Sequence, residues 1–366
     1  MLASPICDRS DLAMAVFGIK RFAGIGKKVA HPGRAGGETT MTGCAKMLLS
    51  AALVMAASAR VGLGEIKHRL LIVDESRHAL RYVDESDAMK NWDMPIGGGF
   101  HDIQLIGGNR AIVSSSWGYS VYDLAARKLL REVKPEGITR VYSARRTADG
   151  TVLLGTNQKQ GVVIFELDKD GAVIRKATFP KIAALRAMRL TRDGHIMLAE
   201  NDGATEVAFD ASAGGGKIIR RVKLPRSRNA FMALKKPGGN YLVSGGFAST
   251  FYEFKPDGSV VSQWQAPMPA GLVNGFYAGF SVLNNGHVVV ANWTGHGATD
   301  SKKGWQIIEF DRSGKVVWKW HDPDRAGSLN NVIVADDLDF AEFQDDADLA
   351  RGAGGKAGTA GSGKAR

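Results

Sequence analysis

Three residues of the sequence have side chains that could take part in acid–base chemistry. His101 could act as a general base or as a metal ligand, with Tyr142 or Arg186 beside it. Such a set would suit an enzyme of the lactonase, lyase or sulfotransferase kind. The same histidine could instead be hydrogen-bonded to a neighbouring carbonyl group and have no chemical role, so both interpretations stay open.

A second group of residues could hold a metal ion or a ligand. Glu200-Asn201-Asp202 offers the hard oxygen donors that Ca²⁺ or Mg²⁺ prefers, but it could equally be a polar turn that ends at Gly203. Aromatic and amide side chains could bind a small molecule, since an indole face stacks on sugars, aromatic rings or cations. The candidate ligand-binding residues are Trp117, Tyr119, Asn229, Tyr277, Asn292, Trp293, His296 and Asn331.

The elements that would position these residues are set by a repeat. Tight turns of the Asp-Gly or Asn-Gly kind recur, each followed at once by an apolar strand, as at Asp149-Gly150, Asp193-Gly194 and Asn285-Gly286. The glycines of successive turns are 42, 44, 45 and 47 residues apart. A second turn recurs within each unit, as at Asp257-Gly258. Two hairpins per unit give four antiparallel strands in about 45 residues, which is the period of a propeller blade.

Counting these units predicts a six-bladed all-β propeller between residues 66 and 336. Five complete units fall at 101–135, 140–180, 184–225, 229–267 and 276–322. One partial unit remains at each end: three strands between His68 and Met94, and a lone strand from Asn330 to Ala335. We expect this C-terminal strand to complete the first blade and close the ring, because closure leaves no free sheet edge.

The repeats resemble two known families. The segment Asp311-Arg312-Ser313-Gly314-Lys315 and the strand that ends in Trp318 are similar to the repeat of bacterial PQQ-like propellers, and the turns resemble those of NHL-type six-bladed propellers. Gly99-Phe100-His101-Asp102 is more weakly similar to arylsulfotransferase-type propellers, in which a central histidine is catalytic. Quinoprotein dehydrogenases use eight blades and a vicinal cysteine pair. Both are missing from this sequence, so we expect no PQQ and no required cofactor.

In propellers similar to regucalcin, ligands meet the face on which the innermost strands begin. The loops that enter these strands carry the first set of candidates: His101, Tyr142, Arg186, Asn229, Tyr277 and Asn331. The loops between second and third strands share that face and carry Trp117, Asn157 and Asn292. The insertion at 293–304 makes one of these loops long, and long loops in compact folds are often functional. Arg186, Arg226 and Arg228 could make the rim positive or could be solvated surface charges.

The first 65 residues show no blade pattern. Lys46, the short apolar run from Met47 to Ala56 and Ala57-Ser58-Ala59 fit a cleaved secretory signal at 41–59, so 1–40 is interpreted as a disordered leader or an over-extended start. We therefore expect a periplasmic or secreted protein with no membrane span after cleavage. Residues 337–366, acidic and then rich in Gly, Ala and Lys, are expected to form a disordered tail.

The remaining composition excludes several classes. The formal net charge of +11 is scattered, without the basic and aromatic clusters that nucleic-acid binding would need. Both cysteines, Cys7 and Cys44, precede the repeats, so we expect neither a disulfide nor a thiolate metal site in the domain. The sequence predicts a monomeric, exported, non-catalytic propeller that binds a small molecule or an envelope protein at the channel mouth. The propeller enzyme described above is the alternative.

Overall fold

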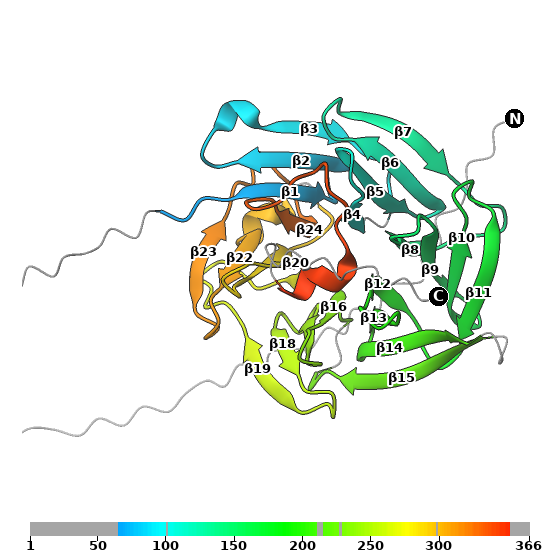
Figure 1. The fold of residues 1–366 in the computed structure, drawn as a ribbon. Coiled ribbons are helices and arrows are strands. Elements are labelled where there is room, and N and C mark those ends of the chain that lie inside the picture. The colour runs from blue at the N-terminus through cyan, green and yellow to red at the C-terminus, as the bar shows by residue number, and fades with distance from the viewer. Residues whose placement is uncertain (1–64, 100–101, 211–214, 227–228, 298, 352–366) are drawn as a thin grey trace, which may run out of the picture. The chain divides into compact units, whose positions relative to one another are not determined.

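The computed structural model describes residues 65–99, 102–210, 215–226, 229–297 and 299–351. These residues belong to one compact unit that begins at Gly62. They form six four-stranded antiparallel sheets arranged as a ring, so the predicted six-bladed β-propeller is confirmed (Figure 1). The predicted signal segment and leader lie outside the described residues.

The first three blades use the expected four strands each. From the innermost strand outward they are β24 (Leu329–Val334), β1 (Arg69–Asp74), β2 (Ala79–Asp84) and β3 (Trp92–Pro95); β4 (Ile103–Leu105), β5 (Arg110–Ser115), β6 (Gly118–Asp123) and β7 (Lys128–Val133); and β8 (Val141–Arg146), β9 (Val152–Gln158), β10 (Gly161–Leu167) and β11 (Val173–Phe179).

The last three blades repeat the plan. Their strands, in the same order, are β12 (Leu185–Leu190), β13 (Ile196–Glu200), β14 (Gly203–Asp210) and β15 (Gly215–Lys223); β16 (Met232–Lys235), β17 (Tyr241–Ser244), β18 (Phe251–Phe254) and β19 (Val260–Trp264); and β20 (Phe276–Val282), β21 (Val288–Trp293), β22 (Ile307–Phe310) and β23 (Val316–Trp320). The described residues also form three short 3₁₀ helices: η1 (Ala88–Lys90), η3 (Asp300–Lys303) and η4 (Asp346–Arg351).

The ring closes as the sequence predicts. β24 pairs antiparallel with β1, with Leu70 opposite Val334 and Ile72 opposite Val332. The two strands come from opposite ends of the domain, so the first blade has no unpaired inner edge. Closure adds an apolar contact, because Leu70, Ile72 and Val332 pack with Val289 and Ile307 of the neighbouring sixth blade.

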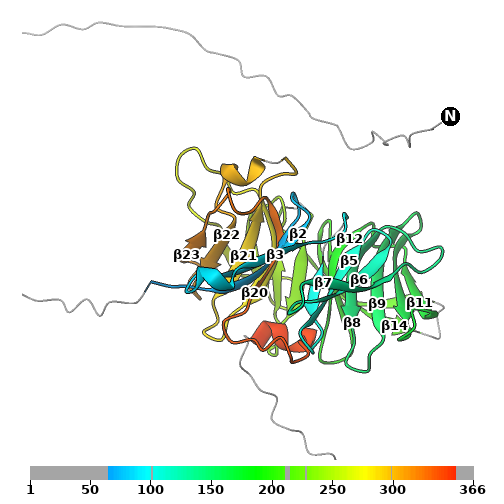
Figure 2. The ribbon, with the colours of Figure 1, turned by 90° about the horizontal axis from the view of Figure 1, so that it is seen from above.

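The two faces of the ring differ. We call the face on which the innermost strands begin the upper face, and the face on which they end the lower face. Figure 2 shows η3 on the upper side and η4 on the lower side. The insertion that contains η3 therefore extends the upper face, as the loop lengths predict.

The C-terminal segment corrects an expectation. Residues 337–351 do not form a solvated tail, since they cross the lower face and reach the channel. Phe343 forms a bridge with Ile106, and the Gln344 N–H donates to the Leu105 carbonyl at 3.1 Å. The side chain of Asp346 is 2% exposed. Residues 352–366, the rest of the predicted tail, lie outside the described residues.

No helix among the described residues is long and apolar enough to cross a membrane.

Candidate functional site

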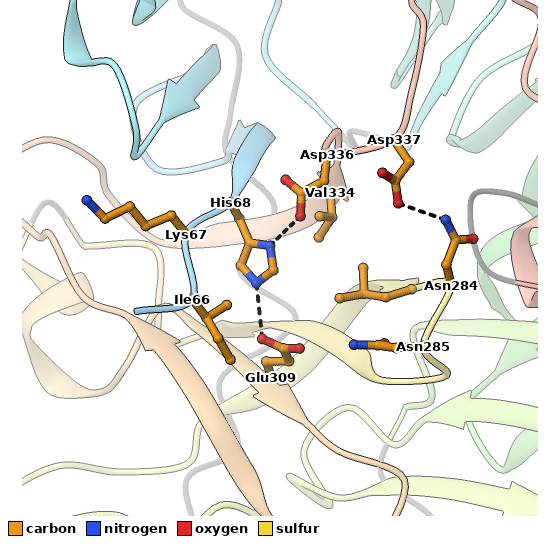
Figure 3. A pocket seen from close by; sticks show the side chains of 10 residues that line it. Ile66, Lys67, His68, Asn284, Asn285, Glu309, Val334, Asp336 and Asp337 are labelled. Carbon is orange, nitrogen blue, oxygen red and sulfur yellow. Dashed lines mark hydrogen bonds and ion pairs between the residues drawn. The ribbon is translucent and has the colours of Figure 1, made fainter. Parts of the chain in front are cut away.

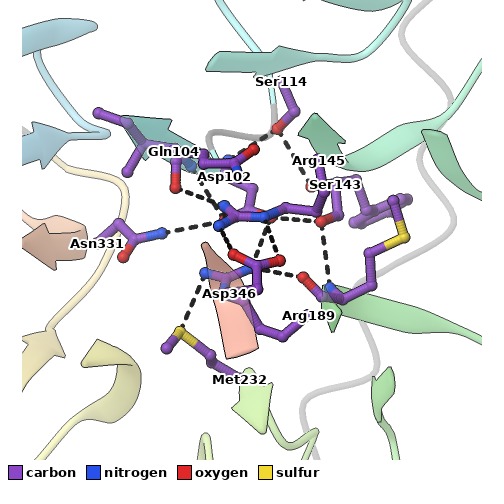
Figure 4. Close-up of polar contacts among 12 residues, drawn as sticks. Asp102, Gln104, Ser114, Ser143, Arg145, Arg189, Met232, Asn331 and Asp346 are labelled. Atoms are coloured by element: carbon purple, nitrogen blue, oxygen red, sulfur yellow. Dashed lines mark hydrogen bonds and ion pairs between the residues drawn. The ribbon is translucent and has the colours of Figure 1, made fainter. Parts of the chain in front are cut away.

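Four buried charged side chains meet at the channel axis (Figure 4). Arg145 Nε donates to Asp346 Oδ2 at 2.9 Å, and an Arg189 guanidinium nitrogen donates to Asp102 Oδ2 at 2.8 Å. Each of the four is at most 2% exposed. The two positive charges and the two negative charges cancel. A folded protein can bury charged side chains away from water only when they are paired in this way.

The environment shifts the pKa of both arginines. Burial lowers the pKa of Arg189, and the positive charge of Arg145 lowers it further. Burial acts in the same direction on Arg145, but Asp346 and Asp102 outweigh it and raise the pKa of that side chain. The positive charge of Arg145 is thus better compensated by nearby carboxylates than that of Arg189. Arg189 depends on Asp102 for a compensating negative charge.

The lower end of the channel is closed by the C-terminal segment. The Leu190 N–H donates to Asp346 Oδ2 at 3.0 Å, and the Gln104 amide donates to the Gln344 carbonyl at 3.2 Å. At the surface, Arg192 pairs with Asp348 at 2.6 Å. The C-terminal segment therefore covers the lower end of the axis.

The innermost strands are irregular where they reach the upper face. The register of β8 against β9 shifts between Val141 and Ser143, which leaves Tyr142 as an extra residue, and β24 shifts in the same way around Asn330. The start of β12, at Arg186, also contains one extra residue, and so does β20 after Tyr277. Such β-bulges re-aim side chains and are common beside active sites. Here they give the channel an upper mouth with side chains different from those of a regular strand.

Three of these side chains have features that suit ligand binding. Arg186 lies over the Tyr142 ring, with 5.9 Å between the guanidinium carbon and the ring centre. Arg186 pairs with no carboxylate in the described part of the chain, and it is only partly buried. The Asn330 Oδ1 atom is buried without a hydrogen-bond partner among the described residues. The mouth thus offers the Arg186 guanidinium, which no described carboxylate neutralises, and the Asn330 Oδ1 atom as a hydrogen-bond acceptor.

An aromatic patch adjoins the mouth on the side of the fifth and sixth blades. Phe231, just before β16, contacts Phe276 with ring centres 5.8 Å apart, and Phe247 contacts Phe276 at 4.7 Å. Trp293 lies 6.0 Å from Phe276 and 4.6 Å from the His296 ring. Phe247 is 51% exposed, so the patch has an open apolar surface. We call these five residues the aromatic patch.

The first blade fixes the outer edge of the patch. The Trp293 indole donates to Glu75 Oε2 at 3.0 Å, and His296 Nδ1 lies 2.9 Å from Glu75 Oε1. One carboxylate therefore orients two rings of the patch. Trp293 and His296 were predicted as binding residues and come together here, whereas Phe231 and Phe247 were not singled out from the sequence.

Four predicted binding residues have structural roles instead. Tyr277 is fully buried, and its hydroxyl accepts from the Ala266 N–H at 3.0 Å. Asn292 is also fully buried, and its amide joins Gly275 to Trp305. Tyr119 belongs to the apolar contact between the second and third blades. Strand alternation turns these three side chains away from the mouth, where the sequence analysis placed them.

Asn331 is displaced from the mouth in the same way. It is 2% exposed and lies against Gly279, where an added Cβ would come within 2.1 Å of its Oδ1 atom. Its amide lies 3.5 Å from Asp102 Oδ1. It therefore supports the charged axis, and the residue at the mouth is its neighbour Asn330.

The other predicted positions are spread over the upper face. Asn229 is partly buried with a φ of 61°, and its N–H donates to the Asn201 carbonyl. Trp117 is 57% exposed in a separate hollow of the second blade. Arg226 is exposed. His101 and Arg228 lie outside the described residues, so their predicted roles are untested.

The predicted Ca²⁺ or Mg²⁺ ligands have other partners. The Glu200 carboxylate lies 2.9 Å from Arg221 Nε and accepts from the Thr205 hydroxyl. Burial raises the pKa of Glu200, although Thr205 and Arg221 act against this. Asp202 is exposed, and its carbonyl accepts from the Leu224 N–H. The arrangement favours the polar-turn interpretation over the metal site.

A different cluster has the right elements for a metal ion: Asp193, His195 and Glu206. The position between the two carboxylates is already taken by the Lys235 ammonium, which lies 2.7 Å from both. His195 Nδ1 lies 2.7 Å from Glu206 Oε1. The cluster is therefore an ion-pair network in its present form.

This network is one copy of a repeated contact. In four blades, the residue after the turn glycine contacts a glutamate of the third strand. The pairs are Thr151 with Glu166, His195 with Glu206, Asn240 with Glu253, and His287 with Glu309. A cation joins each glutamate: Arg175, Lys235, Lys236 and His68, respectively. Its recurrence shows that the contact stabilises the blades and is not specific to one site.

The comparisons with known proteins agree with this fold. No family model matches the chain, and no curated protein matches its sequence. Among solved structures, a protein of unknown function from Bacteroides caccae is 22% identical with a TM-score of 0.58, over 73% of this chain and 98% of its own. Virginiamycin B lyase from Staphylococcus aureus is 16% identical with a TM-score of 0.46, over 64% and 73%. The likeness to the Bacteroides caccae protein shows a six-bladed β-propeller alone, and the PQQ-like and NHL-type resemblance stays a prediction.

Proposed function

We propose that this protein is a non-catalytic binding propeller whose upper mouth holds a small ligand with an acidic group and a flat apolar or aromatic body. The acidic group pairs with Arg186, and the ring rests on the aromatic patch. The observation that carries the proposal is the set of β-bulges at which Tyr142, Arg186 and Asn330 lie, on the face opposite the one that the C-terminal segment covers.

The chemistry of the mouth supports binding more than turnover. A guanidinium remains protonated in proteins and forms two parallel hydrogen bonds to a carboxylate, so Arg186 suits anion recognition. Exposed rings supply contact area with little loss of conformational freedom. Phe247, half exposed at the centre of the patch, has this character.

The test is a binding screen with aromatic carboxylates such as benzoate, cinnamate and indole-3-acetate, each paired with its neutral amide. Thermal shift and calorimetry on the full chain should show binding of an acid and at least tenfold weaker binding of its amide. Arg186→Met and Phe247→Ala should each weaken binding of the acid at least tenfold. Arg192→Met, an arginine on the lower face, is the matched control and should bind like the wild type.

Equal affinity for acids and amides, or unchanged binding by Arg186→Met, would refute the small-ligand proposal. Capture of an envelope protein that Phe247→Ala abolishes, with no acid bound, would replace the ligand by a protein partner.

The propeller enzyme is the second candidate, and the contact between Tyr142 and Arg186 favours it. These are two of the three residues expected to act together, and the third, His101, directly precedes the buried Asp102 in the sequence. Conversion of a bound acid, detected by mass spectrometry and abolished by both His101→Ala and Tyr142→Phe, would establish it. Complete recovery of unchanged ligand would favour binding.

We further propose that the domain acts outside the cytoplasm, because the segment 41–59 has the pattern of a secretory signal. Mass spectrometry of the protein from its own cells tests this. A mature N-terminus near residue 60, in the periplasmic or secreted fraction, is expected. Intact protein that retains residues 41–59 in the cytoplasm would contradict it.

A further inference from the structure

The second blade carries a hollow that is separate from the channel mouth. A cavity of about 240 Å³ opens between the segment that enters this blade and the strands β5, β6 and β7. None of the described residues that line it belongs to an innermost strand. The lining residues are Gly97, Gly98, Val113, Ser114, Ser115, Trp117, Ser120, Tyr122, Glu132 and Lys134.

Trp117 forms an exposed apolar side of this hollow. It lies in the turn between β5 and β6, directly before Gly118, and is 57% exposed. A Cβ at Gly118 would lie 2.0 Å from the Val133 carbonyl oxygen, so only glycine lets this turn pack so closely on β7. The close packing fixes the turn that presents the indole. A tryptophan held in the open by a tight turn is suited to stack on a ligand.

The rest of the wall is polar. Ser115, Ser120 and Tyr122 contribute hydroxyl groups, and the Gly97 N–H donates to the Tyr122 hydroxyl at 3.4 Å. The Ser115 Oγ atom is buried and has no hydrogen-bond partner among the described residues. A buried hydroxyl without a partner costs free energy, and a small rotation about its side-chain bond would bring it to a ligand in the hollow.

A charged pair lies at the edge of the hollow. Glu132 and Lys134 are 2.7 Å apart, and their side chains are 43% and 56% exposed. Such a pair offers one strong acceptor and one strong donor without a net charge. A neutral ligand rich in hydroxyl groups matches this combination better than an ion does.

We propose that this hollow is a carbohydrate subsite that holds one pyranose ring. The apolar C–H face of the sugar stacks on Trp117, and its hydroxyl groups bond to Ser115, Glu132 and Lys134. The size agrees, because pockets for drug-sized ligands have volumes of about 300–1,000 Å³. A cavity slightly below this range suits a single sugar ring. The subsite requires no ligand at the channel mouth. It can therefore be tested independently of the proposed function.

Saturation-transfer NMR on the full chain tests this with methyl glycosides of glucose, galactose, mannose and N-acetylglucosamine at millimolar concentration. We expect at least one glycoside to bind through its C–H protons. Trp117→Ala should lose this transfer, Trp117→Phe should retain part of it, and Glu132→Gln should weaken binding severalfold. Because Trp117 is exposed, these variants should melt like the wild type.

Phe247→Ala is the matched control, since it removes a half-exposed ring from the aromatic patch and leaves the hollow intact. Phe247→Ala should bind the glycoside like the wild type and lose binding of the aromatic acid. Trp117→Ala should lose binding of the glycoside and bind the aromatic acid like the wild type. The absence of transfer from all four glycosides, or wild-type transfer in Trp117→Ala, would overturn the carbohydrate subsite without affecting the channel mouth.

Discussion

Arg145 and Asp346 are 201 residues apart in the sequence and form two hydrogen bonds with each other at the propeller axis. Arg145 belongs to an innermost strand of the third blade, whereas Asp346 belongs to the segment that follows ring closure. The pair therefore attaches the C-terminal segment to the centre of the domain. Asp346 is the residue of this segment whose side chain reaches the buried arginines.

Replacing Asp346 by Asn should destabilise the domain strongly. The change leaves Arg145 buried with less compensating charge, and removal of one partner of a buried pair typically costs about 3–5 kcal/mol. Chemical denaturation should show this loss in the free energy of unfolding. Asp348→Asn, which affects the exposed pair with Arg192, should cost at most about 1 kcal/mol. Equal effects of the two substitutions would contradict the role given to Asp346.

The domain should also lose stability at alkaline pH through His68 (Figure 3). Its Nδ1 lies 2.6 Å from Asp336 and its Nε2 lies 3.0 Å from Glu309. Burial alone would lower the pKa of His68, but the hydrogen bonds and charges of the two carboxylates outweigh it and raise the pKa to about 9. The folded state therefore holds its proton more tightly than the unfolded state, whose pKa is the ordinary 6.5.

The sign follows from linkage. The stabilisation is complete below about pH 6.5 and is lost as the pH rises toward 9, since only the folded protein stays protonated in this range. Melting temperatures from pH 6 to pH 10 should fall with this profile. In His68→Gln the fall should be much smaller, and in His321→Gln, an exposed histidine, it should match the wild type. A wild type that is equally stable at pH 6 and pH 9 would refute this assignment.

Much of the fold could be predicted because its determinants are local. Each Asp-Gly or Asn-Gly turn specifies its own hairpin, and the regular spacing then requires identical blades. Even the closing strand was predictable, since a lone apolar strand at one end matched a blade that lacked its innermost strand at the other. The pairing of Leu70 with Val334 confirms that inference.

The site was predicted less well, because it depends on departures from strand regularity. A bulge moves the exposed position by one residue, so Asn331 was predicted where Asn330 lies, and Tyr277 where its neighbour Phe276 contributes to the aromatic patch. Phe247 could have been found, because it lies near the end of a second strand, as Trp117 and Trp293 do. The burial of Asp346 depends on an arginine two hundred residues away, which local composition does not reveal.

Tyr277 and Tyr142 should respond differently to loss of their hydroxyl groups. Tyr277→Phe removes the acceptor of the buried Ala266 N–H and the donor to Asn274, which should cost about 1–3 kcal/mol of unfolding free energy. Tyr142→Phe, at the partly exposed mouth, should change stability by less than about 0.5 kcal/mol. Calorimetric unfolding of both variants checks this. The opposite order would contradict the structural role given to the Tyr277 hydroxyl.

The network around Lys235 leads to a prediction about metal binding. Asp193, His195 and Glu206 have a suitable arrangement for a divalent ion, but the Lys235 ammonium lies between the carboxylates. Hydrogen bonds from Lys235 help to lower the pKa of Asp193 to about 2, against the effect of burial. An ion would have to displace a cation that is already well paired. We therefore expect that Zn²⁺ does not bind these residues in the wild type and does not raise its melting temperature.

Lys235→Ala should reverse this behaviour. Without Zn²⁺ the variant should melt below the wild type, because two carboxylates then face each other without a cation. With Zn²⁺ it should regain stability, since the ion supplies the missing charge and His195 adds a nitrogen ligand. Lys236→Ala, in the equivalent network of the next blade that contains Asn240 in place of a histidine, should show little gain. A gain of the wild type that His195→Ala abolishes would instead mean that the metal displaces Lys235 and that the cluster is a genuine binding site.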